Sequence, residues 1–111
     1  MSDVLNQLSQ LLQDRKQFAS SDDSYVAQLH AKGLNKILEK MSEECTETLL
    51  AAKDAQTTSG KEQVIYETAD LWFHSMVMLS HLDIDIQAVL DELDRRLGLS
   101  GLEEKKLRST S

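Results

Sequence analysis

The chain contains no proline and only four glycines, at positions 33, 60, 98 and 101. Proline removes a backbone hydrogen-bond donor and breaks helices, and glycine costs about 1 kcal/mol relative to alanine inside a helix. The segments between the glycines can therefore form long helices, and no window alternates with the period of two expected for a strand. This pattern predicts an all-α fold.

A chain of 111 residues, 41% of them hydrophobic, is long enough for one domain with a modest core. We expect a single all-α domain over residues 1–111. It divides into an N-terminal helix and loop over 1–23, a core over 24–106 and a polar tail over 107–111.

The formal net charge of −7 argues against a nucleic-acid or anionic membrane surface, because such a chain repels phosphate. The single cysteine, Cys45, excludes an intramolecular disulfide and a cysteine-based zinc site. The first residues lack the basic region and apolar run of a signal peptide, and no apolar segment approaches membrane-spanning length. We therefore expect a soluble, cytoplasmic protein with no nucleic-acid or membrane partner.

Apolar residues at three- and four-residue spacing predict helices over about 3–18, 25–55, 61–82 and 85–97, with a short helix after Ser100. Gly33 interrupts the second segment, where it either permits close packing or breaks the helix. Gly98 ends the fourth segment. Side chains suited to cap helix N-termini are Asp22, Asp23 or Ser24 for the second, Ser59 with Glu62 for the third, Asp83 or Asp85 for the fourth, and Ser100 with Glu103 for the last.

The second and third helical segments differ in how their apolar residues are distributed. The second carries one stripe, made of Leu34, Ile37, Leu38, Met41, Cys45, Leu49 and Ala52. Within it, Cys45 is expected to be a small core residue. The third is apolar all round its axis, at Leu71, Trp72, Phe73, Met76, Val77, Met78 and Leu79. Such a helix must be buried on every side, so we expect a homodimer to cover it. On the fourth, the residues expected to face inward are Ile86, Val89, Leu90 and Leu93.

Two clusters of carboxylates border the faces that are expected to pack together. Glu44 and Glu47 lie three residues apart beside the apolar stripe, and Glu67 and Asp70 have the same spacing on the next helix. If these helices pack antiparallel, the clusters face one groove, and a cation there would offset their repulsion. Four oxygen ligands with open positions suit Mg²⁺. The alternative is two ordinary solvated helix faces. A di-iron site is disfavoured because the chain lacks its Glu-x-x-His pattern.

Further polar residues adjoin this predicted site. Glu43 lies farther round the helix than Glu44, so it is a better candidate for handling water than for binding metal. His74 shares the face of Asp70 and is either a supporting or substrate contact or an ordinary boundary histidine. Lysines recur every four residues on the approach to the acidic sector, where they either bind phosphates or form a solubilising face; they are Lys32, Lys36 and Lys40.

The pattern Glu43-Glu44-x-x-Glu47 followed by Glu67-x-x-Asp70 resembles the EExxE…ExxD signature of the all-α, MazG-like nucleotide pyrophosphohydrolases. More narrowly, segments 24–29, 36–40, 46–53, 66–75 and 98–105 resemble the phosphoribosyl-ATP pyrophosphatase family, over about residues 24–106. The chain departs from that family at Ser42, usually glycine, and at Leu97, often acidic. No carboxylate of the signature is missing.

The resemblance implies Mg²⁺-dependent hydrolysis of phosphoribosyl-ATP to phosphoribosyl-AMP and pyrophosphate, the second step of L-histidine biosynthesis. It also implies a homodimer or a larger assembly. Four carboxylates would hold the metal: Glu44, Glu47, Glu67 and Asp70. The resemblance leaves the number of metal ions open. Glu43 or one of these would orient or deprotonate the attacking water, so the catalytic candidates are Glu43, Glu44 and Glu47. The substrate-binding candidates are Lys32, Lys36, Lys40 and His74.

Two other functions stay open from the sequence alone. A house-cleaning nucleoside triphosphate pyrophosphohydrolase on the same scaffold would prefer free triphosphates to phosphoribosyl-ATP. A non-enzymatic helical dimerisation module would gain no stability from Mg²⁺, whereas a folded metal site would.

Overall fold

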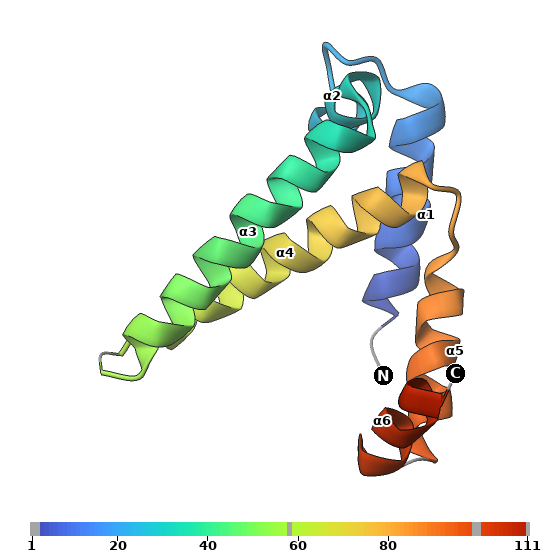
Figure 1. Ribbon diagram of the computed structural model, residues 1–111. Coiled ribbons are helices and arrows are strands. Elements are labelled where there is room, and N and C mark those ends of the chain that lie inside the picture. Colours follow the sequence, from blue (N-terminus) through green and yellow to red (C-terminus); the bar gives the residue numbers. More distant parts are fainter. Residues whose placement is uncertain (1–2, 58, 99–100, 111) are drawn as a thin grey trace.

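The computed structural model describes residues 3–57, 59–98 and 101–110, and these form helices and no strand (Figure 1). The prediction of an all-α fold is confirmed. The helices are α1 (Val4–Phe18), α2 (Tyr25–Lys32), α3 (Leu34–Ala55), α4 (Lys61–His81), α5 (Ile86–Leu97) and α6 (Gly101–Thr110). Within the described ranges, no helix is long and apolar enough to cross a bilayer.

The two longest helices, α3 and α4, lie side by side and antiparallel (Figure 1). They form a hairpin whose closed end projects away from the rest of the molecule. At the other end, α2 packs on α3, while α1 packs on both α2 and α4. The first helix also contacts α5, which runs down beside it towards α6. The antiparallel packing that the carboxylate groove requires is therefore present.

The hydrophobic core lies where α1, α2 and α5 meet the hairpin. Its most completely buried side chains come from three different helices: Leu12, Ile37 and Val77. Four further buried residues complete the cluster, namely Val26, Leu29, Met76 and Ile86. The core therefore holds α2 against the beginning of α3, at the open end of the hairpin.

Gly33 breaks the long helix that the periodicity predicts over 25–55. Its φ of +98° and ψ of 177° lie in a region that only glycine adopts without strain. The Gly33 N–H still donates to the Leu29 carbonyl, and the Gly33 carbonyl accepts from the Ile37 N–H. The chain therefore ends one helix and starts the next within a single residue. Of the two alternatives for Gly33, the structure shows the break.

The predicted caps are partly confirmed. Ser24 caps α2 and Asp85 caps α5, each through a side-chain oxygen that accepts a backbone N–H. The capping box proposed at Ser59 is wrong, because Gly60 occupies the N-cap position of α4 and makes no side-chain cap bond. The cap proposed at Ser100 lies outside the described residues.

Several apolar side chains expected inside are exposed in this chain. Cys45, expected in the core, is exposed, as are Leu38 and Leu49 of the same stripe. On α5, Val89 and Leu93 are also exposed, although they were expected to face inward. The physical reason is that the hairpin and α5 extend beyond the elements that would cover them (Figure 1). Within the apolar stripe, Ile37 is fully buried, whereas its neighbour Leu38 is 42% exposed.

Candidate metal centre

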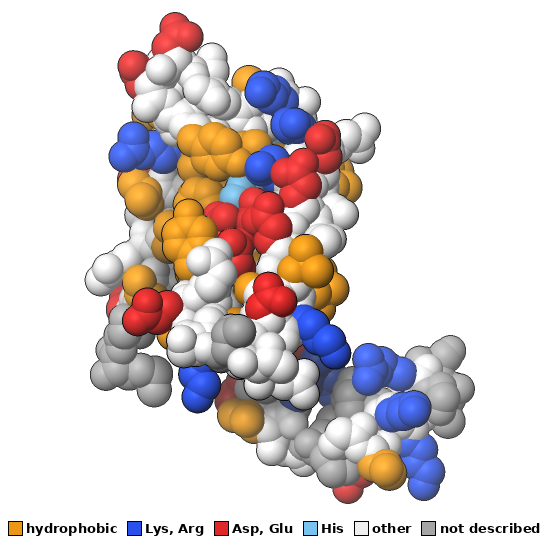
Figure 2. All heavy atoms as spheres, turned by 90° about the vertical axis from the view of Figure 1, so that its left-hand side faces the viewer, with side chains coloured by type: hydrophobic (Ala, Val, Ile, Leu, Met, Phe, Trp, Pro, Cys, Tyr) orange, Lys and Arg blue, Asp and Glu red, His pale blue; other side chains and the backbone are white. Residues whose placement is uncertain are grey.

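Four carboxylates from two helices meet in one place. Glu44 and Glu47 come from α3, and Glu67 and Asp70 come from α4; one oxygen of each lies within 4.8 Å of the others. The three-residue spacing places each pair on one helix face, and the antiparallel packing brings the two faces together. Acidic side chains accordingly gather in the middle of the face shown in Figure 2, flanked by apolar patches. The two carboxylate pairs therefore face each other, as the sequence predicts for antiparallel helices.

Two members of this carboxylate cluster are buried. The exposed fraction is 4% for Glu44 and 8% for Glu67, and the Oε2 atom of each has no hydrogen-bond partner among the described residues. A buried, unpaired carboxylate oxygen is costly, and such atoms call for an explanation such as a bound ion. The unpaired oxygens and the oxygen-only donor set fit a hard divalent cation.

The electrostatics of the carboxylate cluster point the same way. Burial, followed by the neighbouring carboxylates Asp70 and Glu47, raises the pKa of Glu44 to about 7. Burial also raises the pKa of Glu67, opposed by a 2.7 Å hydrogen bond from Gln63 Nε2 and reinforced by Glu47 and Asp70. A divalent cation would invert this balance by favouring the charged forms.

Glu43 stands apart from the carboxylate cluster. It is exposed, and Lys40 Nζ donates to its Oε2 at 2.9 Å; this hydrogen bond is the main reason its pKa is lowered. Lys40 also lies 3.9 Å from Glu44 Oε1, so its ammonium sits at the edge of the site. The other two lysines lie farther from the carboxylate cluster. Lys36 forms an exposed ion pair with Glu39 within α3, and Lys32 is exposed at the last position of α2.

Two supporting residues were not singled out in the sequence. The Thr48 hydroxyl lies 2.7 Å from the Glu44 carbonyl oxygen and 3.1 Å from that of Glu67, so it joins α3 to α4 beside the cluster. Gln63 orients Glu67 as described above. Both lie four residues from a cluster member on the same helix, which is the spacing that could have identified them.

His74 is brought to the carboxylate cluster as expected, together with a residue that the sequence did not single out. The His74 side chain is buried, with Nδ1 2.8 Å from the Asp70 carbonyl oxygen and Nε2 2.9 Å from the Tyr25 hydroxyl. Glu44, Asp70 and His74 also form a second group whose ligand atoms lie close enough to hold a metal. Tyr25 reaches the site from α2, so no spacing within one helix could reveal it.

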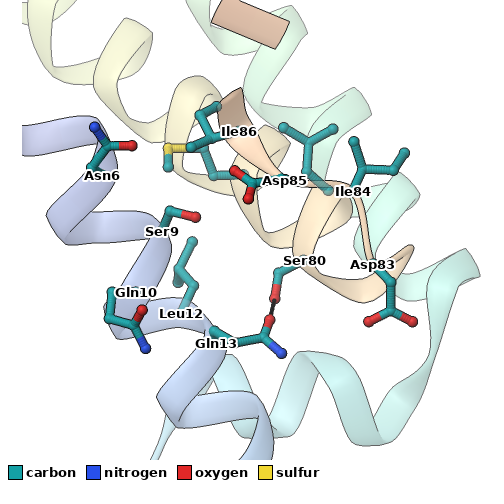
Figure 3. Close-up of a pocket in the computed structure, with 12 residues that line it drawn as sticks. Asn6, Ser9, Gln10, Leu12, Gln13, Ser80, Asp83, Ile84, Asp85 and Ile86 are labelled. Carbon is teal, nitrogen blue, oxygen red and sulfur yellow. Dashed lines mark hydrogen bonds between the residues drawn. The ribbon is translucent and has the colours of Figure 1, made fainter. Parts of the chain in front are cut away.

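A cavity of about 430 Å³ lies elsewhere, between α1 and the turn joining α4 to α5 (Figure 3). Ser80 Oγ donates to Gln13 Oε1 at 3.2 Å within it. None of the described residues that line it is a lysine or arginine, and none belongs to the carboxylate cluster. Its polar groups are amides, hydroxyls and the carboxylates Asp83 and Asp85, which do not suit a polyphosphate.

The model of the phosphoribosyl-ATP pyrophosphohydrolase family matches residues 5–97. This range contains all four members of the carboxylate cluster and the helices that carry them.

Proposed function

The chain belongs to the phosphoribosyl-ATP pyrophosphohydrolase family, a hydrolase family of histidine biosynthesis, and on that premise we propose its reaction. It hydrolyses phosphoribosyl-ATP to phosphoribosyl-AMP and pyrophosphate in a Mg²⁺-dependent step, the second of L-histidine biosynthesis, in the cytoplasm. The whole chain acts as one domain. The observation that carries this proposal is the meeting of four carboxylates, two of them buried with an unpaired oxygen, between α3 and α4.

The carboxylate cluster supplies the metal ligands in this proposal: Glu44, Glu47, Glu67 and Asp70. When bound there, Mg²⁺ supplies charge neutralisation for the phosphate oxygens and the leaving pyrophosphate. Gln63 and Thr48 hold the ligands in place, through the Glu67 carboxylate and the two main-chain carbonyls respectively.

Hydrolysis requires a positioned water and an acceptor for its proton. The water oxygen bonds to phosphorus, the bridging bond between the α- and β-phosphates breaks, and pyrophosphate leaves. Glu43, whose pKa Lys40 holds low, is a poor proton acceptor and is assigned to orienting the water. Glu44 and Glu47, beside it on α3, complete the catalytic set, and one of them accepts the proton that the water loses. Positioning and charge stabilisation provide most of the acceleration.

The substrate side of the proposed site is formed by lysines. Lys40 is best placed to meet a phosphate, because its ammonium lies between Glu43 and the carboxylate cluster. An incoming phosphate would compete with Glu43 for that ammonium. Lys32 and Lys36 extend the substrate-binding set along α2 and α3. His74, the fourth candidate, already has a partner at each ring nitrogen, so it is assigned to supporting Asp70 and not to a direct contact with the substrate.

We also propose that the protein is a homodimer joined through the hairpin. Large apolar side chains are exposed on both of its helices, including Leu49, Leu50, Ile65, Tyr66 and Trp72. The radius of gyration is 16.6 Å, against about 13 Å for a compact chain of this length. A second copy would cover these side chains. Light scattering should give the mass of a dimer, and a monomer at all concentrations would contradict this part.

A substrate panel tests the proposed reaction. Pyrophosphate release is measured with Mg²⁺ for phosphoribosyl-ATP, ATP and a set of canonical and modified nucleoside triphosphates. The proposal predicts the highest kcat/KM for phosphoribosyl-ATP. A preference for a free triphosphate would favour the house-cleaning function on the same scaffold, and turnover of none would favour a non-enzymatic module.

A further inference from the structure

Two side-chain hydrogen bonds, each made by a histidine of α4, attach the short helix α2 to α4. At the start of α2, the Tyr25 hydroxyl lies 2.9 Å from His74 Nε2. Towards its end, His30 Nδ1 lies 2.9 Å from His81 Nδ1. Only the first of these bonds ends at the carboxylate cluster, because His74 is in contact with Asp70.

The hydrogen bonds of His74 define which ring nitrogen carries the proton. Nδ1 lies 2.8 Å from the Asp70 carbonyl oxygen, which can only accept, so Nδ1 must donate. The same Nδ1 lies 3.5 Å from Asp70 Oδ1. In the neutral ring, Nε2 then carries a lone pair, and the Tyr25 hydroxyl donates to it. With a side chain only 4% exposed, the ring has both nitrogens occupied and no freedom to turn.

We propose that Tyr25 is a positioning residue of the metal centre, which acts through His74 on Asp70. The hydroxyl fixes the tautomer and the orientation of the imidazole, and the imidazole fixes the turn of α4 that carries the Asp70 carboxylate. Partners bonded directly to a metal ligand typically matter about 10–100-fold for metal affinity or activity, and Tyr25, which acts one residue farther out, is expected at the lower end of that range. This inference rests on the proposed function of the carboxylate cluster.

The surroundings of Tyr25 support this role. Ser24, the buried N-cap of α2, accepts the Ala27 N–H at 3.2 Å and so fixes the backbone from which Tyr25 projects. The Tyr25 and His74 rings meet edge to face, with centroids 5.9 Å apart and planes at 80°. Burial raises the pKa of the Tyr25 phenol, with Lys40 opposing and the nearby carboxylates adding to the effect. The Tyr25 side chain is 45% exposed, and it is the 2.9 Å bond to His74 Nε2 that directs its hydroxyl towards the carboxylate cluster.

The second bond between α2 and α4 provides a matched control. The His30 and His81 rings are nearly parallel, at 13°, with centroids 5.1 Å apart. Replacing His30 by phenylalanine removes one hydrogen bond between the same two helices and keeps an aromatic ring. Neither residue of this pair belongs to the carboxylate cluster. Its loss should loosen α2 without disturbing Asp70.

The test compares Tyr25→Phe with His30→Phe. Mg²⁺ binding is measured by calorimetry without substrate, and kcat and KM are measured with phosphoribosyl-ATP. We expect Tyr25→Phe to weaken Mg²⁺ binding and to lower kcat, each by about 10-fold, with KM for the substrate within about twofold. His30→Phe, which removes the bond to His81 and also the buried, unpartnered His30 Nε2, should leave Mg²⁺ affinity and kcat unchanged. Equal effects of both variants on Mg²⁺ affinity would overturn the inference, because they would indicate general loosening of α2.

A double-mutant cycle keeps the inference testable whatever the stability of Tyr25→Phe. His74→Gln should lower Mg²⁺ affinity by itself, and adding Tyr25→Phe should then cost nothing more. Independent, additive losses would overturn the inference. Wild-type protein that neither binds Mg²⁺ nor releases pyrophosphate would refute the proposed function itself, whereas active wild type with an unaffected Tyr25→Phe variant would refute only the role of Tyr25.

Discussion

Glu44 on α3 and Asp70 on α4 place carboxylate oxygens within 4.8 Å of each other across the hairpin. Burial and this neighbour contribute to a pKa of about 7 for Glu44. The pair is unfavourable when both groups are charged and becomes favourable when a cation lies between them. The structure therefore links the stability of the hairpin to the ion that the proposed reaction requires.

Glu44→Gln should separate stability from activity. Glutamine keeps the shape of the side chain and removes a buried charge, so the metal-free variant should melt several degrees above wild type at pH 8. The same change should lower pyrophosphate release by about 100-fold or more, because a ligand is lost. Thermal unfolding and a pyrophosphate assay provide the two readouts.

Glu62→Gln is the matched control for this substitution. Glu62 is exposed in the first turn of α4 and lies outside the carboxylate cluster. It should leave both the melting temperature and the turnover close to wild type. Wild-type turnover in a folded Glu44→Gln variant would contradict the assignment of Glu44.

The stability of the metal-free protein should fall as the pH rises. The pKa of Glu44 is raised from 4.5 to about 7 in the folded state. Its contribution to stability is therefore full below about 4.5 and is lost as the pH rises through about 7. Mg²⁺ binds the deprotonated form, so the increase in melting temperature on adding Mg²⁺ should grow over the same interval. An increase that does not change with pH would contradict the raised pKa.

Thr48→Val should weaken the contact between the two hairpin helices. It removes the hydroxyl that reaches the carbonyl oxygens of Glu44 and Glu67, at a cost of about 1 kcal/mol. Denaturant unfolding measures this loss. Thr46→Val, at an exposed position two residues earlier on α3, is the control and should be nearly neutral. Equal effects of the two substitutions would show that the hydroxyl does not join the helices.

Gly33→Ala should destabilise the protein by about 1–3 kcal/mol, because alanine is strained at the φ of +98° found there. Gly98→Ala is the control. Gly98 has a φ of −86°, and an added Cβ would lie 3.8 Å from the nearest atom, the Arg95 carbonyl oxygen. That substitution should be neutral or slightly stabilising. A neutral Gly33→Ala variant would mean that the chain tolerates a continuous helix across this position.

Helical spacing predicted which carboxylates share a helix face. Glu44 and Glu47, and likewise Glu67 and Asp70, are three residues apart, so each pair occupies one face whatever the tertiary structure. The antiparallel hairpin follows from two long helices joined by a short loop. Only the pairing of the two faces needed the folded molecule.

Features that depend on packing between distant elements were not predictable in the same way. Tyr25 meets His74 because the break at Gly33 frees α2 from the line of α3, and α2 then reaches α4 through its side chains. The exposure of Cys45 depends on how far the hairpin projects beyond the other helices, which periodicity does not encode. Spacing within a helix determines which residues share a face, but it does not determine what covers that face.

The most direct test of the central claim is pyrophosphate release from phosphoribosyl-ATP, measured with wild type and with Glu67→Gln while Mg²⁺ is titrated from zero. Glu67 is buried, has an unpaired oxygen and lies on the opposite helix from the catalytic glutamates. We predict that wild type is inactive without a divalent ion and is activated by Mg²⁺ to saturation, and that the folded variant reaches at most about one hundredth of that rate. Turnover by wild type in the presence of a chelator, or an identical Mg²⁺ response in the variant, would contradict the account.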